Sequence, residues 1–526
     1  MSFVELLSRL GGMGRFQVTY VAALAVPLLM LASHNLLQNF TAGVPEHHCR
    51  PRAVANGSSA PLAVSIPWEQ LRPQRCRRFL EPQWHLLDAN GSANAAANGT
   101  AGQAATEPCR DGWTYLDGIF RDTIVTEWDL VCDSQKLRQV AQSIYMAGIL
   151  VGSCLFGVLS DKFGRRALLT WCYLQLGAMG VGTAAAPSLP VYCVCRFLTG
   201  LAMAGVSLNS ASLCMEWIPT EARAIVGTIN GYCYTLGQFV LAAAAFALPR
   251  WRQLQLAVSL PFFVFFFYSW LFVESARWQV TSGRPDLALR GLRKVARVNG
   301  RKEEGDKLSE ESLRSLVLRE PPLPGGAVAA LVRTPGMRTV SCGVAFVWFS
   351  TSFAYYGLAM DLQGFGFNVY LSQVVFGAVD IPAKLLSVLA ISCLGRRPAQ
   401  GGSLALAGLC ILGNIFVPSE LPALRMALAV IGKGALAASF NCAFIFTGEL
   451  FPTVIRCADG HGAGGTLARV GGMVAPLVRL TAEVTPALPL VIYGGGPGGV
   501  GAGHGRAARD AAHGAARDRA RRGEEV

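Results

Sequence analysis

Long apolar blocks recur along the chain and are separated by shorter polar segments. Each block runs for roughly 18–24 residues with few charges, which is the length that an α-helix needs to cross a ~30 Å hydrocarbon core. Strands of a membrane barrel would alternate apolar and polar residues, and these blocks do not alternate. The pattern predicts a weak last helix that begins near 488 and eleven earlier membrane-spanning helices, at 17–36, 139–159, 168–186, 190–212, 224–247, 254–273, 340–360, 372–393, 401–417, 424–447 and 461–482.

A long polar segment, about 37–138, separates the first two blocks. It contains four glycosylation sequons and four cysteines, which are Asn39, Asn56, Asn90, Asn98, Cys49, Cys76, Cys109 and Cys132. Sequons and an even number of cysteines are typical of an oxidising, extracellular side and predict two disulfide bonds. Chance sequons and free thiols are the alternative interpretation. Three cysteine pairings are possible, and the sequence leaves all three open.

A second polar segment, about 274–339, has the opposite character, because it contains no cysteine and no sequon. It is rich in basic residues, namely Arg277, Arg284, Arg290, Arg293, Lys294, Arg297, Arg301, Lys302 and Lys307. Such an excess of Lys and Arg predicts a cytoplasmic loop. Five predicted crossings separate this segment from the glycosylated one, so the two fall on opposite sides of the membrane. The N-terminus is therefore predicted to be cytoplasmic.

Composition agrees with a membrane protein. The chain has 526 residues, of which 52% are hydrophobic and 15% charged, and its mean hydropathy is +0.38. A soluble domain normally has about 25% charged residues. The net charge of +13 does not predict nucleic-acid binding, because most basic residues flank apolar blocks. We find no phosphate-binding glycine motif, no zinc-like cysteine spacing and no H-E-x-x-H helix, so neither an enzyme nor a cofactor is predicted.

Two motifs occur twice at nearly the same separation, which indicates an internal repeat. The sequence E-x-x-P-T-x-x-R stands at 216–223 and again at 449–456, an offset of 233, and the Gly-Arg-Arg at 164–166 recurs at 395–397, an offset of 231. A six-helix unit used twice is expected, with tight turns at Gly164 and Gly395. Ion pairs of these polar residues across the two bundles could hold one conformation and break in another. The candidate gating residues are Asp161, Arg165, Glu216, Arg223, Arg396, Glu449 and Arg456. The arginines could equally be structural anchors at the membrane surface.

Several motifs carry a family resemblance. Residues 157–166, GVLSDKFGRR, resemble the major facilitator signature. Residues 127–132, 274–278, 333–336, 377–384 and 448–452 (EWDLVC, ESARW, RTPG, GAVDIPAK and GELFP) resemble the organic anion transporter branch of solute carrier family 22. The resemblance covers about 1–493. It implies an all-α integral membrane protein with the major facilitator fold, two six-helix bundles around a central cavity.

The resemblance also implies a function. Small organic anions, such as aromatic carboxylates or steroid sulfates, would be exchanged for an intracellular dicarboxylate across the plasma membrane by alternating access. The expected domains are an N-terminal bundle at 1–273 with the extracellular loop 37–138, a cytoplasmic linker at 274–339, a C-terminal bundle at 340–493 and a tail at 494–526.

Charged residues inside membrane helices are candidate binding residues, because each costs about 2.5–3.5 kcal/mol on insertion scales. Arg469 is the best candidate for an anion, since no acid lies within one helical turn of it. Lys384 is a second, although Asp380 precedes it by four residues and could neutralise it. Arg196 lies near the start of its block and could extend to the membrane surface. The resemblance assigns five further residues to the cavity, Tyr232, Tyr355, Tyr356, Phe440 and Asn35, although aromatic residues in membrane helices more often serve packing.

Three other functions stay open. An organic cation transporter of the same family would be expected to have an acid at position 469, and a non-transporting receptor would share the helices. A defective product is the third possibility, because seven of the ten residues at 494–503 are glycine and Pro497 lies among them. Since glycine costs about 1 kcal/mol and proline about 3 kcal/mol in a helix, this stretch predicts an incomplete twelfth helix followed by an aberrant Gly/Ala/Arg-rich tail.

Overall fold

The computed structural model describes residues 3–53, 59–69, 72–86, 104–319, 335–450, 461–483 and 485–497. The chain divides into two compact units. One contains Met1–Asn39, Gln139–Phe246 and Gln255–Val526, and the other contains Phe40–Arg138 together with Ala247–Leu254. We call them the helical unit and the loop unit.

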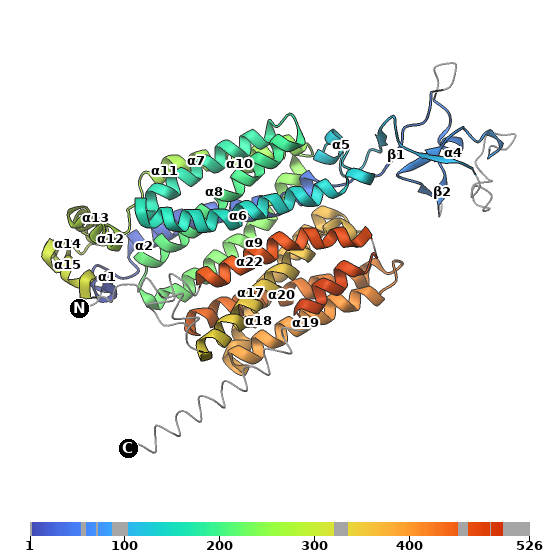
Figure 1. The fold of residues 1–526 in the computed structure, drawn as a ribbon. Helices are drawn as coiled ribbons and strands as arrows, with labels where there is room; N and C mark the ends of the chain where they lie inside the picture. The colour runs from blue at the N-terminus through green and yellow to red at the C-terminus, as the bar shows by residue number, and fades with distance from the viewer. Residues whose placement is uncertain are drawn as a thin grey trace. The chain divides into compact units, whose positions relative to one another are not determined.

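Long helices form the helical unit, and they follow the predicted spans closely (Figure 1). The first half has α2 (Arg15–Leu36), α6 (Lys136–Phe163), α7 (Arg165–Ala184), α8 (Leu189–Trp217), α9 (Arg223–Ala247), α10 (Trp251–Ser259) and α11 (Pro261–Ser269). The second half has α17 (Pro335–Ala359), α18 (Val369–Leu394), α19 (Arg396–Phe416), α20 (Pro422–Leu450) and α22 (His461–Val478). Helix α7 packs on α8 and α11 in one half, and α17 packs on α20 and α22 in the other.

Seven helical segments in the described part of the chain are long and apolar enough to cross a membrane: Arg15–Thr41, Cys132–Phe163, Leu189–Trp217, Ser341–Ala359, Val369–Leu394, Arg396–Phe416 and Pro422–Thr447. Two of the remaining predicted spans are the continuous helices α7 and α9, of 20 and 25 residues, and the others are shorter or interrupted. The sixth, for example, is divided into α10 and α11 of nine residues each. Proline 261 stands in the first turn of α11, where its missing N–H leaves no helical bond unmade.

The internal repeat is visible in the backbone. Gly164 precedes α7 with φ = 97°, and Gly395 precedes α19 with φ = 90°. Residues with a side chain rarely adopt such positive φ values, whereas glycine does so readily. A Cβ on Gly164 would also lie 2.6 Å from Glu274 Oε2. Equivalent positions of the two sequence repeats therefore make the same sharp turn between helices.

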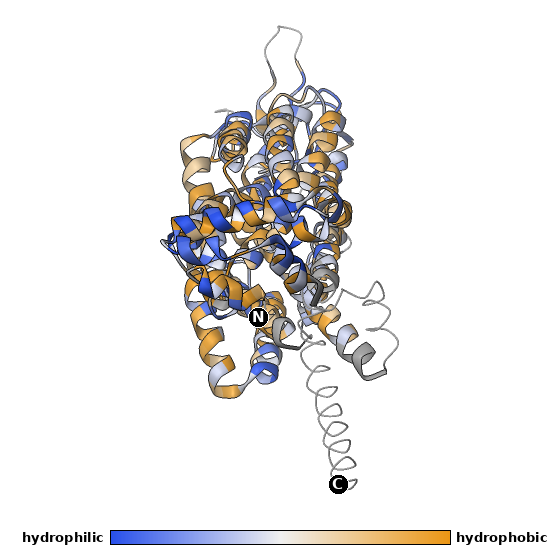
Figure 2. Ribbon diagram, turned by 90° about the vertical axis from the view of Figure 1, so that its left-hand side faces the viewer, coloured by the Kyte–Doolittle hydropathy of each residue, from blue (hydrophilic) through white to orange (hydrophobic). Residues whose placement is uncertain are grey.

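Short polar helices follow α11 in the segment that the charge pattern predicts to be cytoplasmic. They are α12 (Ala276–Thr281), α13 (Pro285–Val298), α14 (Lys302–Asp306) and α15 (Glu310–Arg319), and α1 (Phe3–Arg9) contributes to the same hydrophobic core. Helix α13 buries Ala288, Leu292 and Val295, which lie on one face at helical spacing. Figure 2 shows hydrophilic residues on these short helices near the N-terminus and mostly hydrophobic residues on the long ones.

The loop unit contains short strands and two disulfide bonds. Its elements include β1 (His47–Cys49), α4 (Leu62–Ser65), β2 (Trp68–Glu69), β3 (Arg72–Pro73), β4 (Arg77–Phe79), η1 (Trp84–Leu86), β5 (Thr106–Pro108), β6 (Trp113–Tyr115), α5 (Ile124–Trp128) and η4 (Cys132–Ser134), and α3 (Gln38–Thr41) leads into it. Antiparallel pairs join β1 to β6, β2 to β3 and β4 to β5. The disulfides are Cys49–Cys109 and Cys76–Cys132, so the two predicted bridges are present and one of the three open pairings is chosen.

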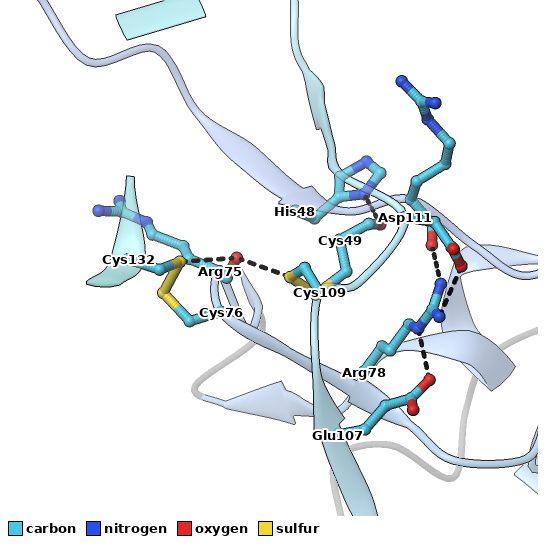
Figure 3. Close-up of a disulfide and its surroundings, with 10 residues drawn as sticks. His48, Cys49, Arg75, Cys76, Arg78, Glu107, Cys109, Asp111 and Cys132 are labelled. Atoms are coloured by element: carbon cyan, nitrogen blue, oxygen red, sulfur yellow. Dashed lines mark hydrogen bonds and ion pairs between the residues drawn. A yellow bond between two sulfur atoms is a disulfide. The ribbon is translucent and has the colours of Figure 1, made fainter. Parts of the chain in front are cut away.

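Arg78 of β4 connects several segments of the loop unit through hydrogen bonds and ion pairs (Figure 3). The side chain of Arg78 is 3% exposed, and its Nε donates to Glu107 Oε1 at 2.9 Å. Its other nitrogens lie 2.6 Å from Asp111 Oδ2 and 2.9 Å from the Arg50 carbonyl oxygen. Burial raises the pKa of Glu107, but hydrogen bonds and charge from Arg78 and Arg52 outweigh it and hold that pKa below its usual value.

The loop unit also includes the start of the sixth predicted span. The indole of Trp251 donates to Glu127 Oε2 at 2.8 Å, and Arg252 pairs with the same carboxylate. The Trp251 ring lies 5.6 Å from the Trp128 ring in an edge arrangement. Residues 247–254 are therefore held by α5, which the hydropathy pattern alone does not predict.

The last described helical residues, 488–497, extend four residues past 493, where the predicted tail begins. Ten residues are fewer than a membrane span needs, so the incomplete twelfth helix stays a prediction. Tyr493 is 3% exposed and its hydroxyl donates to the Ala475 carbonyl at 2.5 Å. The rest of the predicted tail, 498–526, lies outside the described residues.

Candidate substrate-binding site

A buried ion pair lies in the middle of the second half and reaches the first half. Lys433 of α20 and Asp380 of α18 are 1% and 2% exposed, and Lys433 Nζ lies 3.2 Å from both carboxylate oxygens. The ammonium also donates to the Phe376 carbonyl at 2.7 Å and to Gln238 Oε1 of α9 at 3.2 Å. Gln238 Nε2 donates to Asp380 Oδ2 at 2.9 Å. A neutralised pair thus links α18, α20 and α9.

Lys384 makes no ion pair with Asp380 within 4 Å, although the Asp380 carboxylate acts on it electrostatically. Its Nζ donates to the Gly231 carbonyl at 2.7 Å and to Thr235 Oγ1 at 3.1 Å, both on α9. The Tyr232 ring lies 5.7 Å away, within range of a cation–π interaction. Lys384 is half-buried and keeps its positive charge uncompensated by any acid of the described residues within 4 Å.

Arg469 is the third intramembrane cation of the second half. It lies in α22, is half-buried, and makes no hydrogen bond or ion pair with the described side chains. Its guanidinium interacts electrostatically with the hydroxyl of Tyr356. Glu449, which could have paired with it, has a side chain outside the described residues. Among the three cations, Arg469 therefore has the most unused donor capacity in the described part of the chain.

Aromatic rings line the same region. Tyr355 packs edge-to-face on Tyr356 and on Phe440, with ring centroids 5.6 and 5.3 Å apart, and Lys433 Nζ lies 5.1 Å from the Tyr355 ring. Tyr355 is 6% exposed, whereas Tyr356 and Phe440 are half-buried. The predicted aromatic residues of α17 and α20 therefore do come together, with the inner one against the Lys433–Asp380 pair.

Asn35 belongs to a polar cluster of the first half. Its side-chain oxygen accepts a hydrogen bond from the Tyr145 hydroxyl at 2.8 Å, and its backbone oxygen accepts one from Gln142 at 3.4 Å. Tyr234 is in polar contact with Asn35 and with Tyr356, so the cluster extends to the second half. Four of the five residues that the resemblance assigns to the cavity thus lie in two neighbouring polar and aromatic groups, and the fifth, Tyr232, lies beside Lys384.

The candidate gating residues of the first half form a network within that half. Arg165 lies 3.0 Å from Asp161 and 3.6 Å from Glu216, and the groups that act on the Glu216 carboxylate all come from the first half. The pairing of Glu216 across the two bundles stays a prediction, because its possible partners at 449 and 456 lie outside the described side chains. Glu274 binds the backbone N–H groups of Arg165 and Arg166 at 3.0–3.1 Å, as acids do at helix N-termini.

The other candidate residues make few contacts in the described part of the chain or lie outside it. Arg223 donates to the Met215 carbonyl at 3.1 Å, and Arg396 opens α19 after Gly395. The structure does not describe the side chain of Glu449, nor any part of Arg456, Asn56, Asn90 and Asn98, so the roles of these residues stay predictions.

Asn39 donates through Nδ2 to the Ala359 carbonyl at 2.8 Å. This contact opposes its prediction as a glycosylation site, because that nitrogen is the one a glycan would occupy.

Comparison with known proteins identifies the family. The sugar (and other) transporter family matches residues 93–459. Solute carrier family 22 member 6 of Oryctolagus cuniculus is 53% identical over 501 residues, which cover 94% of this chain and 90% of that protein. Organic anion transporter 3 of the same species is 50% identical over 496 residues, with 94% and 88% covered. The chain belongs to solute carrier family 22.

Solved structures agree on the fold. The partially occluded, inward-open form of the xylose transporter XylE from E. coli has a TM-score of 0.61 at 16% identity, and covers 92% of this chain and 96% of its own. A D-xylose-proton symporter has a TM-score of 0.56. The family match and the curated relatives make this family 22 member a major facilitator membrane transporter and not an enzyme. The opening residues, 11–17 and 34–41, most resemble organic anion transporter six, and this finer resemblance stays a prediction.

Two residues of the site were not singled out by their sequence, Lys433 and Gln238. Lys433 is an intramembrane cation in an apolar block, so the criterion that selected Arg469 also applies to it. Gln238 carries no charge, and its importance depends on its contact with Asp380, which no spacing in the sequence predicts.

Proposed function

We propose that the chain exchanges small organic anions across the plasma membrane by alternating access, with Arg469 as the residue that binds the anionic group. The observation that carries this proposal is the contrast between three intramembrane cations. Lys433 is paired with Asp380, Lys384 is satisfied by two neutral oxygens, and Arg469 has no hydrogen bond or ion pair among the described side chains.

The energetics favour an anion at Arg469. A guanidinium presents a planar fork of donors that matches a carboxylate in a bidentate manner. At about 4 Å and an effective dielectric constant near 20, the attraction between the two charges is of order 4 kcal/mol. The unpaired charge is also expensive to keep in the membrane without a ligand. The substrate that best satisfies these conditions has one ionised carboxylate or sulfate.

The aromatic residues suggest the rest of the substrate. Tyr356 lies beside Arg469, and Tyr355 and Phe440 continue the aromatic surface from it. A largely apolar pocket with a few polar groups suits an aromatic carboxylate or a steroid sulfate. The relatives named as organic anion transporters support this class, and the resemblance supports an intracellular dicarboxylate as the counter-substrate.

Contacts between the halves support alternating access. Helix α9 of the first half meets α18 of the second through Lys384 and through Gln238 with Asp380. Most of these are single hydrogen bonds to neutral groups. Such contacts can be exchanged when one bundle moves against the other, without breaking a buried ion pair, since Lys433 and Asp380 both belong to the second half.

An organic cation is disfavoured as the substrate. A cation needs an available acid in the membrane, and Asp380 in the middle of α18 is already neutralised by Lys433 at 3.2 Å. Gln238 occupies a further lone pair of the same carboxylate. Cation transport therefore requires this pair to separate first.

Uptake measurements test the proposal. Cells that display the protein at the surface, verified by biotinylation, should accumulate labelled p-aminohippurate or estrone sulfate and not tetraethylammonium. Arg469→Ala should lower anion uptake at least tenfold, because the loss of about 1.4 kcal/mol already has that effect. Arg469→Lys should keep part of it. Arg290→Ala, at an exposed position in α13, is the control for loss of one arginine.

Two outcomes would contradict the proposal. Uptake by Arg469→Ala that equals the wild type would remove Arg469 from the binding site. Accumulation of tetraethylammonium in place of the anions would favour the cation transporter. For the plasma-membrane orientation, a tag at the N-terminus should be reached by antibody only after permeabilisation, as expected for a cytoplasmic N-terminus.

A further inference from the structure

Arg196 in α8 is a buried cation that none of the assignments above uses. Its side chain is fully buried, with 0% exposure, and it lies seven residues after the first residue of α8. At 1.5 Å per residue this is about 10 Å along the helix, so Arg196 does not reach the membrane surface as its position near the helix start suggests. The guanidinium carbon instead lies 4.0 Å from the centre of the Tyr145 ring.

All three guanidinium nitrogens of Arg196 lack a hydrogen-bond partner in the described part of the chain. No described acid forms an ion pair with it within 4 Å, because the ion pairs of the first half involve other arginines. The stacked Tyr145 ring compensates part of the charge and occupies one face of the guanidinium plane. The five N–H donors point outward in that plane and remain available.

The ring of His34 in α2 does not supply an acceptor to Arg196, because neither His34 Nδ1 nor any guanidinium nitrogen of Arg196 has a hydrogen-bond partner among the described residues. Its ring is also fully buried, and Nε2 lies 3.1 Å from the Val258 carbonyl oxygen, so Nε2 carries the proton. The other nitrogen, Nδ1, therefore has a lone pair, and it has no partner among the described residues. Arg196 acts electrostatically on this ring, which shows that the two side chains are neighbours. Tyr145, on the other side of Arg196, is engaged with Asn35 at 2.8 Å.

A buried guanidinium without an acceptor is rare in proteins, because leaving a charge unpaired costs several kcal/mol. A water molecule could satisfy individual N–H groups, but it would not compensate the charge. An anion does both. The planar fork of donors left free by the stacked tyrosine has the geometry that binds a carboxylate or a halide edge-on.

We propose that Arg196, stacked on the Tyr145 ring, forms a second anion site in the first half, separate from Arg469. The ligand is a single small anionic group, either a halide ion from the medium or the carboxylate of a transported acid. This inference does not depend on the role of Arg469, and the experiment below is performed without that arginine.

Thermal unfolding of the full-length protein in nanodiscs tests the site. In the Arg469→Gln background, the unfolding temperature is measured in sodium HEPES, which contains neither a halide nor a carboxylate, at constant ionic strength while chloride or glutarate is titrated in. Because a ligand that binds only the folded state stabilises it, saturation of the site should raise the unfolding temperature by about 3 °C or more. A response to chloride identifies a halide, and a response to glutarate alone identifies a carboxylate.

The variant Arg196→Gln in the same background should lose the saturable response, and Arg196→Lys should keep a weaker one because it retains the charge without the fork. An unfolding temperature of Arg469→Gln that is the same in all three salts would overturn the proposal, whether or not the Arg196 variants fold. A saturable response that persists in Arg196→Gln would overturn it as well, since the anion would then bind elsewhere.

Discussion

Removal of one partner of the Lys433–Asp380 pair should destabilise the protein more than removal of both. In Asp380→Asn, the Lys433 ammonium keeps the Phe376 carbonyl and Gln238 as acceptors but loses the counter-charge that the described residues supply. In Lys433→Gln, the carboxylate of Asp380 keeps only the donor of Gln238 at 2.9 Å. Each variant therefore leaves one full charge in a site that is at most 2% exposed.

The magnitude follows from burial. Breaking a buried pair by removing one partner typically costs about 3–5 kcal/mol, which corresponds to a fall of roughly 6–10 °C in unfolding temperature at about 2 °C per kcal/mol. The double variant contains no stranded charge and has two amides that can bond to each other. The free energy of unfolding of the double variant should lie at least halfway between that of the single variants and that of the wild type. The coupling energy between the two side chains should exceed about 1.5 kcal/mol.

Thermal unfolding in nanodiscs measures the four members of this cycle. Asp286→Asn is the control for the loss of an acid, because Asp286 and Arg290 are 51% and 77% exposed and 4.0 Å apart. An exposed pair of this kind contributes at most about 1 kcal/mol, so the control should unfold within about 2 °C of the wild type. Additive losses in the double variant would refute the reasoning, since the two charges would then not stabilise each other.

Two further predictions concern Asn39, which directly precedes the loop unit, and Glu107 within that unit. Asn39→Gln should leave the glycosidase-sensitive change in gel mobility unaltered, because the Asn39 amide already donates to Ala359; a smaller change would show that Asn39 carries a glycan. Glu107 should stabilise the loop unit above pH ~4.3, its value when unfolded, and this contribution should vanish as pH falls through the lowered folded pKa. Proteolysis of the surface-displayed protein should therefore separate Glu107→Gln from the wild type at pH 6, and the difference should decrease as the pH is lowered below about 4.

Hydropathy and the internal repeat were sufficient to predict the main helices and two of their turns. The first span was predicted at 17–36 and is observed at Arg15–Leu36, and the eighth was predicted at 372–393 and is observed at Val369–Leu394. The repeat predicted turns at Gly164 and Gly395, where φ is positive in both. These features are local, since helix length and backbone conformation depend on residues close together in the chain.

Partners across helices were not predictable in the same way. Asp380 and Lys384 share a helix face by spacing, yet Asp380 pairs with Lys433, 53 residues further along. The helical periodicity gives the face of one helix but not the side chain opposite it. The same holds for the cysteines, where Cys49 pairs with Cys109 and Cys76 with Cys132 because the strands between them fold back.

The end of the twelfth helix shows why glycine has a different weight in a membrane helix. The prediction of an incomplete twelfth helix uses helix propensities measured in water, where glycine exposes backbone to solvent. At position 494 an added Cβ would lie 2.7 Å from the Leu412 side chain and 3.1 Å from the Gly408 carbonyl oxygen. At Gly357 a Cβ would lie 2.7 Å from the Tyr493 ring. Small residues thus allow residues 488–497 to pack closely on α19 and α17. Inside a bilayer, water is not available to replace the helical hydrogen bonds of the backbone. Close packing therefore offsets the low propensity of glycine, and Gly494 is a packing residue of the second half.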